Sequence, residues 1–362
     1  KLIYSYANDD SKTDNGTYKD IPLGTMNSSA NTENKIINVT VSVNKSLKNS
    51  DAAQYAEKLD WSIFSSVKKT ETAETPKATE EVAKETINAL KNGEYDDKLT
   101  YLYSCDKNDV KKYSDRYIDV INGFEETFGK DGDIALFSAP GRTEIGGNHT
   151  DHQHGCVLAG SVNLDVISAA RPNGTNTVRI QSRNYPLDVI ELDSLEIREK
   201  EFDKAISLIR GVIKKFVDLG YDVKGFDAYT TSNVLKGSGL SSSAAFEVLV
   251  GTIINGLFAN NEVNPIEIAK FGQFAENVYY NKPSGLMDQM ASSVGSVVAI
   301  DFKSTEEPIV EKVEFDLKKH NHALCIIDSG ADHADLTDEY ATIPSDMKAV
   351  AGFFGKKFLR EV

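Results

Sequence analysis

Residues 236–245 read Lys-Gly-Ser-Gly-Leu-Ser-Ser-Ser-Ala-Ala, between a strand-like run at 226–231 and a long apolar run at 246–258. Small residues at such a strand-to-helix turn let the backbone approach a ligand closely. The first turn of the following helix offers free N–H groups and the positive end of the helix dipole, an arrangement that binds phosphate. The serine hydroxyls add donors and can also ligate Mg²⁺. The segment therefore predicts a site for a nucleotide phosphate.

This segment differs from the common phosphate loop, because the spacing G-x-x-x-x-G-K-[ST] is absent. A serine-capped helix after a glycine turn is the structural alternative, and many α/β proteins contain one. The segment alone does not decide between the two, so the rest of the chain must be considered.

The chain has 362 residues, enough for two domains, and its composition is that of a soluble globular protein. It has 55 acidic and 40 basic residues, giving a formal charge of −15, which disfavours binding to nucleic acid or to an anionic membrane. Cys105, Cys156 and Cys325 are far apart and match neither a disulfide framework nor a metal motif. Reduced thiols indicate a cytoplasmic protein. No apolar run approaches the ~18 residues of a membrane span.

The hydrophobic pattern divides the chain into regions. Residues 1–75 are rich in Asn, Ser and Thr and have no role that we can assign, and residues 76–129 are expected to form a linker and N-terminal helices. Strands and helices then alternate, which predicts an α/β or α+β fold. The expected strands are 36–43, 134–138, 155–170, 177–182, 226–231, 296–302 and 323–328; the expected helices are 79–93, 111–128, 204–219, 242–258, 265–280, 285–294 and 347–359. Because the sequence stops shortly after this last run without a capping residue, we expect it to be a fragment.

Residues 138–155 crowd three histidines, two acids, one arginine and four glycines into one stretch, which is unlike a core strand. Short hydrogen-bonding side chains of this kind suit a sugar or polyol. A metal site is one alternative, formed by His149, Asp151, His152 and His154, although the segment offers no helical pair of histidines. A polar surface loop is the other alternative.

Two carboxylates form a third group. Glu276 lies in an otherwise apolar helical stretch, and Asp288 follows the turn Pro283-Ser284-Gly285. One carboxylate can hold Mg²⁺, and the other can orient or deprotonate a hydroxyl nucleophile. Taken separately, Asp288 is also explained as an acid that stabilises a helix start, and Glu276 as part of a solvated helix face.

Together the three segments resemble one family of small-molecule kinases, which includes the galactokinases and the homoserine, mevalonate and phosphomevalonate kinases. The segments 141–151, 239–244 and 285–289 look like the first galactokinase signature, the ATP-phosphate loop and the catalytic segment. The resemblance covers about 134–340. It implies a two-domain α+β fold with the active site in the cleft between the domains: an ATP-binding domain at 130–302 and an incomplete second domain at 303–362.

The resemblance also implies roles for individual residues. Asp288 would be the base or electrostatic partner for the sugar 1-hydroxyl, and Arg142 would keep it ionised and neutralise charge on the transferred group. Mg²⁺ would be held by Glu276 with Ser241 or Ser242. Contacts to the sugar would come from Asn148, His149, Asp151, Gly285 and Tyr340. ATP would lie on the loop formed by Gly237, Gly239, Leu240, Ser241, Ser242, Ser243 and Ala244.

Two positions depart from the family pattern. Galactokinases usually carry Glu where this chain has Asn148, and Tyr where it has His152. The expected function is therefore a kinase that phosphorylates the anomeric hydroxyl of galactose or a related sugar. Two other functions remain open: a kinase of the same family with another acceptor, and a non-catalytic sugar sensor. The sequence does not indicate an oligomeric state.

Overall fold

The computed structural model describes residues 2–4, 26–31, 36–41, 80–147, 149–234, 238–315, 317–327 and 337–362. The chain divides into two compact units, one formed by Asn8–Lys77 and one by Lys1–Ala7 with Ala78–Val362. Within the smaller unit, strands β2 (Met26–Asn31) and β3 (Ile36–Val41) pair in antiparallel fashion. The larger unit contains every element discussed below.

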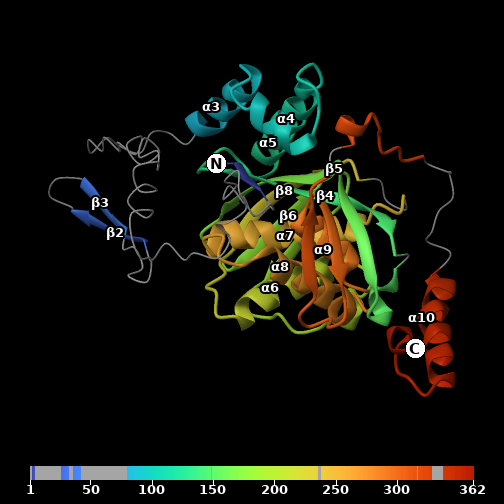
Figure 1. The fold of residues 1–362 in the computed structure, drawn as a ribbon. Coiled ribbons are helices and arrows are strands. Elements are labelled where there is room, and N and C mark those ends of the chain that lie inside the picture. Colours follow the sequence, from blue (N-terminus) through green and yellow to red (C-terminus); the bar gives the residue numbers. More distant parts are fainter. Residues whose placement is uncertain are drawn as a thin grey trace. The chain divides into compact units, whose positions relative to one another are not determined.

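A mixed eight-stranded sheet forms the centre of the larger unit as far as it is described (Figure 1). Its main path runs in the order β1-β4-β5-β8-β6-β7, and β9 joins β5 and β10. The β1–β4 and β6–β8 pairs are parallel and the other pairs are antiparallel. The strands are β1 (Leu2–Tyr4), β4 (Ala135–Gly146), β5 (Cys156–Pro172), β6 (Thr177–Ser182), β7 (Leu187–Glu191), β8 (Phe226–Ser232), β9 (Val297–Asp301) and β10 (Ile309–Val313).

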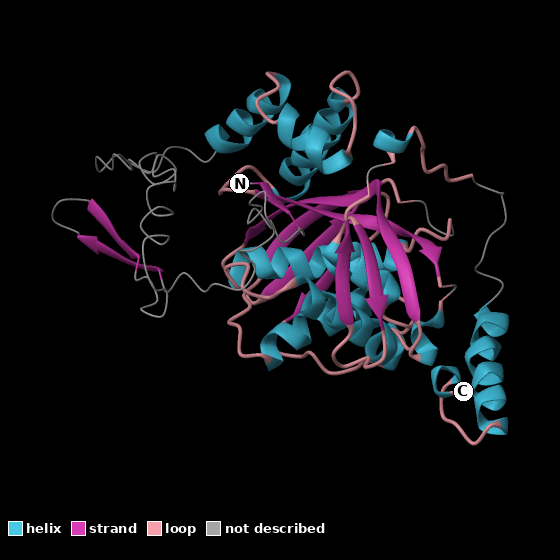
Figure 2. Cartoon of the chain, in the orientation of Figure 1, coloured by secondary structure: helices cyan, strands magenta, loops and turns pink. Residues whose placement is uncertain are grey.

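Helices of the larger unit pack mainly in two groups (Figure 2). The first group comprises α3 (Glu80–Lys91), α4 (Asp96–Tyr103) and α5 (Val110–Phe128). The second comprises α6 (Ala205–Asp218), α7 (Ser242–Phe258), α8 (Pro265–Phe274), the π-helix η3 (Ala275–Tyr279) and α9 (Met287–Val294). Helix α10 (Thr337–Phe353) follows in the sequence, and short 3₁₀ turns occur at Thr150–Gln153, Glu199–Glu201, Lys318–His320 and Leu359–Glu361.

The alternation of side chains along the strands explains why helices cover both faces of the sheet. On β4, Leu136 packs into the core of α3–α5, whereas its neighbour Phe137 packs into the core of α6–α8. On β5, Ile167 and Val166 divide between the same two cores. Successive residues of a strand point to opposite faces, so one apolar strand serves two hydrophobic layers.

Helix α7 lies deep in the second layer. Its residues are buried on nearly all sides, from Ala244 to Asn255. A helix that is apolar all round belongs in a core, and this burial fixes its N-terminus, together with the preceding loop, against β4.

The α+β class expected from the sequence is confirmed, and helix α7 has the bounds expected for it. Four expectations were wrong. The helix expected at 347–359 begins earlier, as α10, and ends at Phe353, so that residues 354–358 are not helical. Residues 138–146 continue β4 instead of forming a loop, 323–327 form no strand, and the helix expected at 265–280 changes to a π-helix after Phe274. Strands β1, β2, β7 and β10 and helix α4 were missed. Among the described residues, no helix is long and apolar enough to cross a membrane.

Candidate active site

The serine-rich loop ends where α7 begins. Ser241 occupies the N-cap position with a left-handed backbone (φ 56°), and its side chain makes no capping hydrogen bond to the helix. Its hydroxyl instead donates to Asp288 Oδ2. The first-turn N–H groups of a helix have no intrahelical acceptors. This loop therefore leaves the N-terminus of α7 available to an anion.

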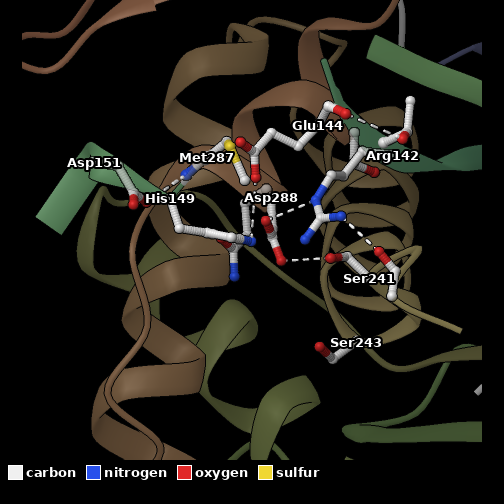
Figure 3. A network of polar contacts seen from close by, with 12 residues as sticks. Arg142, Glu144, His149, Asp151, Ser241, Ser243, Met287 and Asp288 are labelled. Atoms are coloured by element: carbon white, nitrogen blue, oxygen red, sulfur yellow. Dashed lines mark hydrogen bonds and ion pairs between the residues drawn. The ribbon is translucent and has the colours of Figure 1, made fainter. Parts of the chain in front are cut away.

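Arg142 connects this loop to the segment that contains Asp288. It lies on β4, its Nε donates to Asp288 Oδ1 at 2.7 Å, and its Nη1 donates to the Gly239 carbonyl at 2.6 Å (Figure 3). Its backbone N–H also donates to the Leu240 carbonyl at 3.1 Å. A Cβ on Gly141 would lie 2.9 Å from the same carbonyl oxygen, so glycine permits this close approach. Two segments expected to act together are thus in direct contact.

The carboxyl group of Asp288 is held in its ionised form. Burial acts to raise its pKa, but the charge and hydrogen bond of Arg142, with smaller contributions from Ser241 and His149, outweigh burial and lower the pKa below its usual value. An aspartate with this environment is an acceptor at neutral pH. It can orient a hydroxyl group or receive its proton.

Glu276 lies in the π-helix and is 3% exposed, which excludes the solvated helix face considered above. Its Oε1 accepts from Lys282 Nζ at 2.9 Å and from Ser243 Oγ at 3.4 Å, and its Oε2 accepts from Gln289 Nε2 at 2.8 Å. Ser243 is therefore the loop serine that reaches Glu276, whereas Ser241 turns to Asp288. Within the described part of the chain, no hydrogen bond joins Ser242 to either carboxylate.

A second buried carboxyl group lies behind Glu276. Glu247 of α7 is completely buried, and its Oε2 accepts from the same Gln289 amide nitrogen at 3.0 Å. Burial, followed by the negative charge of Glu276, raises the pKa of Glu247 well above its usual value. Gln289 thus donates to both Glu276 and Glu247, and the carboxyl group of Glu247 favours its neutral form.

The histidine-rich segment leads from β4 to the same place. His149 has a left-handed backbone (φ 55°), and its Nε2 lies 3.7 Å from Glu144 Oε2. Asp151 is 3% exposed, and its Oδ2 accepts from the backbone N–H of Met287 at 3.2 Å. Figure 3 shows His149 beside Asp288. A Cβ on Gly285 would lie 1.7 Å from Asp151 Oδ2, so only glycine fits against this aspartate.

Some residues expected at the site have other surroundings. His152 Nε2 lies 3.3 Å from Met347 Sδ, and the ring of His154 packs at a tilt of 31° against Phe358 with ring centroids 3.9 Å apart. Asn148 and Gly237 lie outside the described residues. Tyr340 belongs to α10, but its side chain lies outside the description as well.

Sequence reasoning missed four polar residues that the structure adds to this region: Glu144, Glu247, Lys282 and Gln289. Glu144 stands two positions after Arg142 on a regular stretch of β4, so strand alternation places both on one face. The sequence therefore contained a signal for Glu144. Nothing in the sequence connects Glu247 with Gln289, because their contact depends on tertiary packing. Among the described residues, no group of three or more His, Cys, Asp or Glu side chains could hold a metal ion.

Comparison with known families identifies two segments of the chain. Residues 207–296 match the GHMP kinases N terminal domain, and residues 122–172 match the galactokinase galactose-binding signature. The first segment contains the serine loop, Glu276 and Asp288, and the second contains Arg142, His149 and Asp151. The two halves of the site thus fall in the two matched segments.

Solved structures similar to this chain include three small-molecule kinases. A Lactococcus lactis galactokinase complexed with galactose shares 30% identity, with 54% of this chain and 51% of that chain covered and a TM-score of 0.49. A Methanococcus jannaschii mevalonate kinase shares 17% identity over 59% and 67% of the two chains (TM-score 0.47). A D-glycero-D-manno-heptose 1-phosphate kinase from Bacteriodes thetaiotaomicron shares 20% identity over 51% and 61% (TM-score 0.43).

The chain therefore spans about half the length of the Lactococcus galactokinase. Two family matches lie on the elements that form the site, and they occur in the order expected from the sequence. Residues 207–296 are thus similar to the N-terminal domain of the GHMP kinases, and residues 122–172 to the galactose-binding signature of the galactokinases.

Proposed function

We propose that this protein is a sugar 1-kinase of the galactokinase type, which transfers the γ-phosphoryl group of ATP to the anomeric hydroxyl of galactose or a related sugar. The observation that carries the proposal is the position of Asp288. Its two carboxylate oxygens accept from Arg142 and Ser241, so it joins the galactose-binding signature to the serine loop. An acceptor for a hydroxyl proton thus lies beside an anion-binding helix N-terminus.

Phosphoryl transfer depends mainly on positioning and on neutralising charge, with little covalent chemistry by the protein. In our proposal the first turn of α7 and the 238–244 loop bind the phosphates of ATP. Arg142 neutralises charge that develops on the transferred group, and Asp288 orients the sugar hydroxyl and takes its proton. In the proposal, one side of the sugar site is formed by His149, Asp151 and Gly285, and we call it the near side. Further contacts to the sugar would come from Asn148 and Tyr340.

Mg²⁺, when bound with ATP, supplies further neutralisation of the phosphate charge. The donors present suit this ion, because the Glu276 carboxylate and the Ser243 hydroxyl are hard oxygen ligands. The Glu276 oxygen that faces Ser243 already faces a cation, the ammonium group of Lys282. We therefore assign the protein's share of the metal site to Glu276 and Ser243, in place of the earlier choice of Ser241 or Ser242.

An ADP-coupled assay with a panel of acceptors tests the proposal. The panel contains galactose, glucose, galactosamine, galacturonic acid and mevalonate. We expect ADP release that depends on galactose or a close relative and disappears with 1-deoxygalactose. No acceptor-dependent ADP release would contradict a kinase and favour the non-catalytic sensor. Turnover with a non-sugar alcohol alone would keep the kinase but replace the acceptor.

One observation keeps another acceptor in view. His152 stands where galactokinases usually carry Tyr, and its Nδ1 lies 3.7 Å from Asp151 Oδ1, at the edge of the proposed sugar site. A protonated imidazole there would favour an acceptor with an acidic group. Preference for galacturonic acid over galactose in the same panel would support this second function.

A further inference from the structure

Lys282 forms an ion pair with the buried carboxylate Glu276, and the chemistry described so far gives Lys282 no role. Its Nζ lies 2.9 Å from Glu276 Oε1, and its backbone N–H donates to the Glu276 carbonyl at 3.1 Å. The Lys282 side chain is 50% exposed, whereas that of Glu276 is 4% exposed. The ammonium group therefore closes the solvent side of a carboxylate that is otherwise inside the protein.

The local backbone explains how a residue six positions later reaches Glu276. Helix α8 changes to a π-helix at Ala275–Tyr279, and the chain then folds back through Lys282 before the Pro283–Gly285 turn. Single π-helical turns cost backbone energy and are frequent at functional sites. This turn brings Glu276 and Lys282 together at the end of the helix that faces the serine loop.

The same oxygen of Glu276 is within 3.4 Å of Ser243 Oγ, in the first turn of α7. One oxygen of Glu276 thus links the ammonium group of Lys282 to the helix N-terminus that we assign to phosphate. Three acidic side chains, Glu247, Glu276 and Asp288, gather here, and among the described residues Arg142 forms its ion pair with Asp288. A lysine side chain has a mobile four-carbon stem and three donors, so it can change partners without moving the backbone.

We propose that Lys282 is a second phosphate-binding cation of this site, with its ammonium group held on Glu276 when no nucleotide is bound. In this proposal, which rests on the proposed kinase function, the ammonium group contacts the anionic oxygens of the nucleotide. The carboxylate of Glu276 is then free to accept the divalent cation that accompanies ATP. Lys282 thus serves as partner to a buried acid in the empty site and as phosphate ligand in the filled one.

Calorimetric titration of the whole chain with a non-hydrolysable ATP analogue, in EDTA and in excess Mg²⁺, tests the proposal. A charge-assisted contact of this kind is worth roughly tenfold in affinity. We expect Lys282→Met to weaken binding of the metal-free analogue about tenfold. We expect the gain in affinity on adding Mg²⁺ to become larger than in the wild type, because the ion no longer competes with the ammonium group for Glu276. Lys282→Arg keeps the charge and should bind the metal-free analogue nearly as well as the wild type.

Lys270→Met is the matched control. Lys270 also pairs with a glutamate at 2.8 Å, but its partner is Glu267, one turn earlier on α8, instead of Glu276. It should leave both titrations unchanged. Wild-type affinity of Lys282→Met under both conditions would contradict the proposal and leave Lys282 as a stabilising ion pair only, visible as a lower melting temperature. A wild-type protein that binds no analogue at all would contradict the kinase function, and the role of Lys282 with it.

Discussion

Gly285 is the residue at which a single methyl group would do most damage to the proposed sugar site. A Cβ there would lie 1.7 Å from Asp151 Oδ2 and 2.4 Å from its Cγ, far inside contact distance. Asp151 is buried and is held by the Met287 N–H, so it cannot turn away without losing that bond. We predict that Gly285→Ala lowers the affinity for galactose at least tenfold, measured by calorimetry, while binding of an ATP analogue stays within about twofold.

Gly352→Ala is the control for this substitution, since a Cβ at Gly352 meets nothing within 4 Å. It should bind both ligands like the wild type. If Gly285→Ala binds galactose normally, Asp151 does not contact the sugar and the near side of the sugar site is misplaced.

The family resemblance predicted the contact between Arg142 and Asp288. The contact of Ser241 with Asp288 was not predicted, because Ser241 was expected to hold Mg²⁺. Arg142, Ser241 and Asp288 carry distinctive chemistry within short motifs, and the structure brings them into contact. The partners of Glu276 could not be found in the same way. Nothing in the sequence distinguishes Lys282 from an ordinary surface lysine. Its contact with Glu276 depends on a π-helical turn, which the hydrophobic periodicity does not predict. The choice of Ser243 over Ser241 as the serine beside Glu276 came from the geometry of the helix alone.

At the scale of elements, one buried aspartate ties the N-terminal helices to the sheet. Asp165 of β5 accepts from Tyr103 of α4, Arg116 of α5 and Ser138 of β4, each at 2.6 Å. Removing one partner of a buried ion pair leaves the other charge uncompensated. We predict that Asp165→Ala lowers the free energy of unfolding by about 3 kcal/mol, measured by urea denaturation.

An exposed ion pair between α5 and the residue after β6 serves as comparison. Asp119 and Arg183 are 2.7 Å apart, and their side chains are 59% and 39% exposed. Because exposed pairs contribute little, Asp119→Ala should change the free energy of unfolding by less than about 1 kcal/mol. Equal effects of the two substitutions would show that Asp165 does not anchor the helices.

Strand β7 carries an acid whose ionisation opposes folding. Burial, with the charge of Glu201, raises the pKa of Asp188 from 3.8 to about 6. A raised pKa means that the stabilising contribution is fully present below the unfolded value and is lost as pH rises through about 6. We predict that Asp188→Asn is about 2 kcal/mol more stable than the wild type at pH 7.5 but equal to it at pH 3, by denaturation at both values. An equal difference at the two pH values would contradict this assignment.

Elements whose sequence carries one clear secondary-structure signal were predictable. Elements whose sequence combines strand-like and loop-like residues were not. Helix α7 combines an unbroken apolar run with a serine start, so its bounds followed from the sequence. Strand β4 was cut short in the prediction because Gly141, Arg142 and Glu144 look like loop residues. They remain in the strand because β5 pairs with β4 as far as Gly146, with two register shifts, and because the serine loop packs against Gly141. Tertiary packing overrides local pattern at this functional strand.

At the scale of the whole molecule, the site depends on contacts between distant parts of the chain. The Arg142–Asp288 pair spans 146 positions, and it joins the segment that matches the galactokinase galactose-binding signature to the segment that matches the GHMP kinases N terminal domain. Motif order predicted that these segments belong together, but their common orientation is a product of the sheet, in which β4 and β5 both pack against α7 and α9. The proposed boundary between two kinase domains near residue 303 and the role of residues 1–75 stay predictions.

The central claim is that Asp288 handles the acceptor hydroxyl beside a nucleotide held on the serine loop. The direct test is the rate of galactose-dependent ADP formation by Asp288→Asn and by the wild type, with ATP-analogue affinity measured on the same samples. We predict a fall in rate of 10²–10⁴-fold, typical of losing a positioned base, with nucleotide affinity within about threefold. A variant that turns over within tenfold of the wild type would contradict the account.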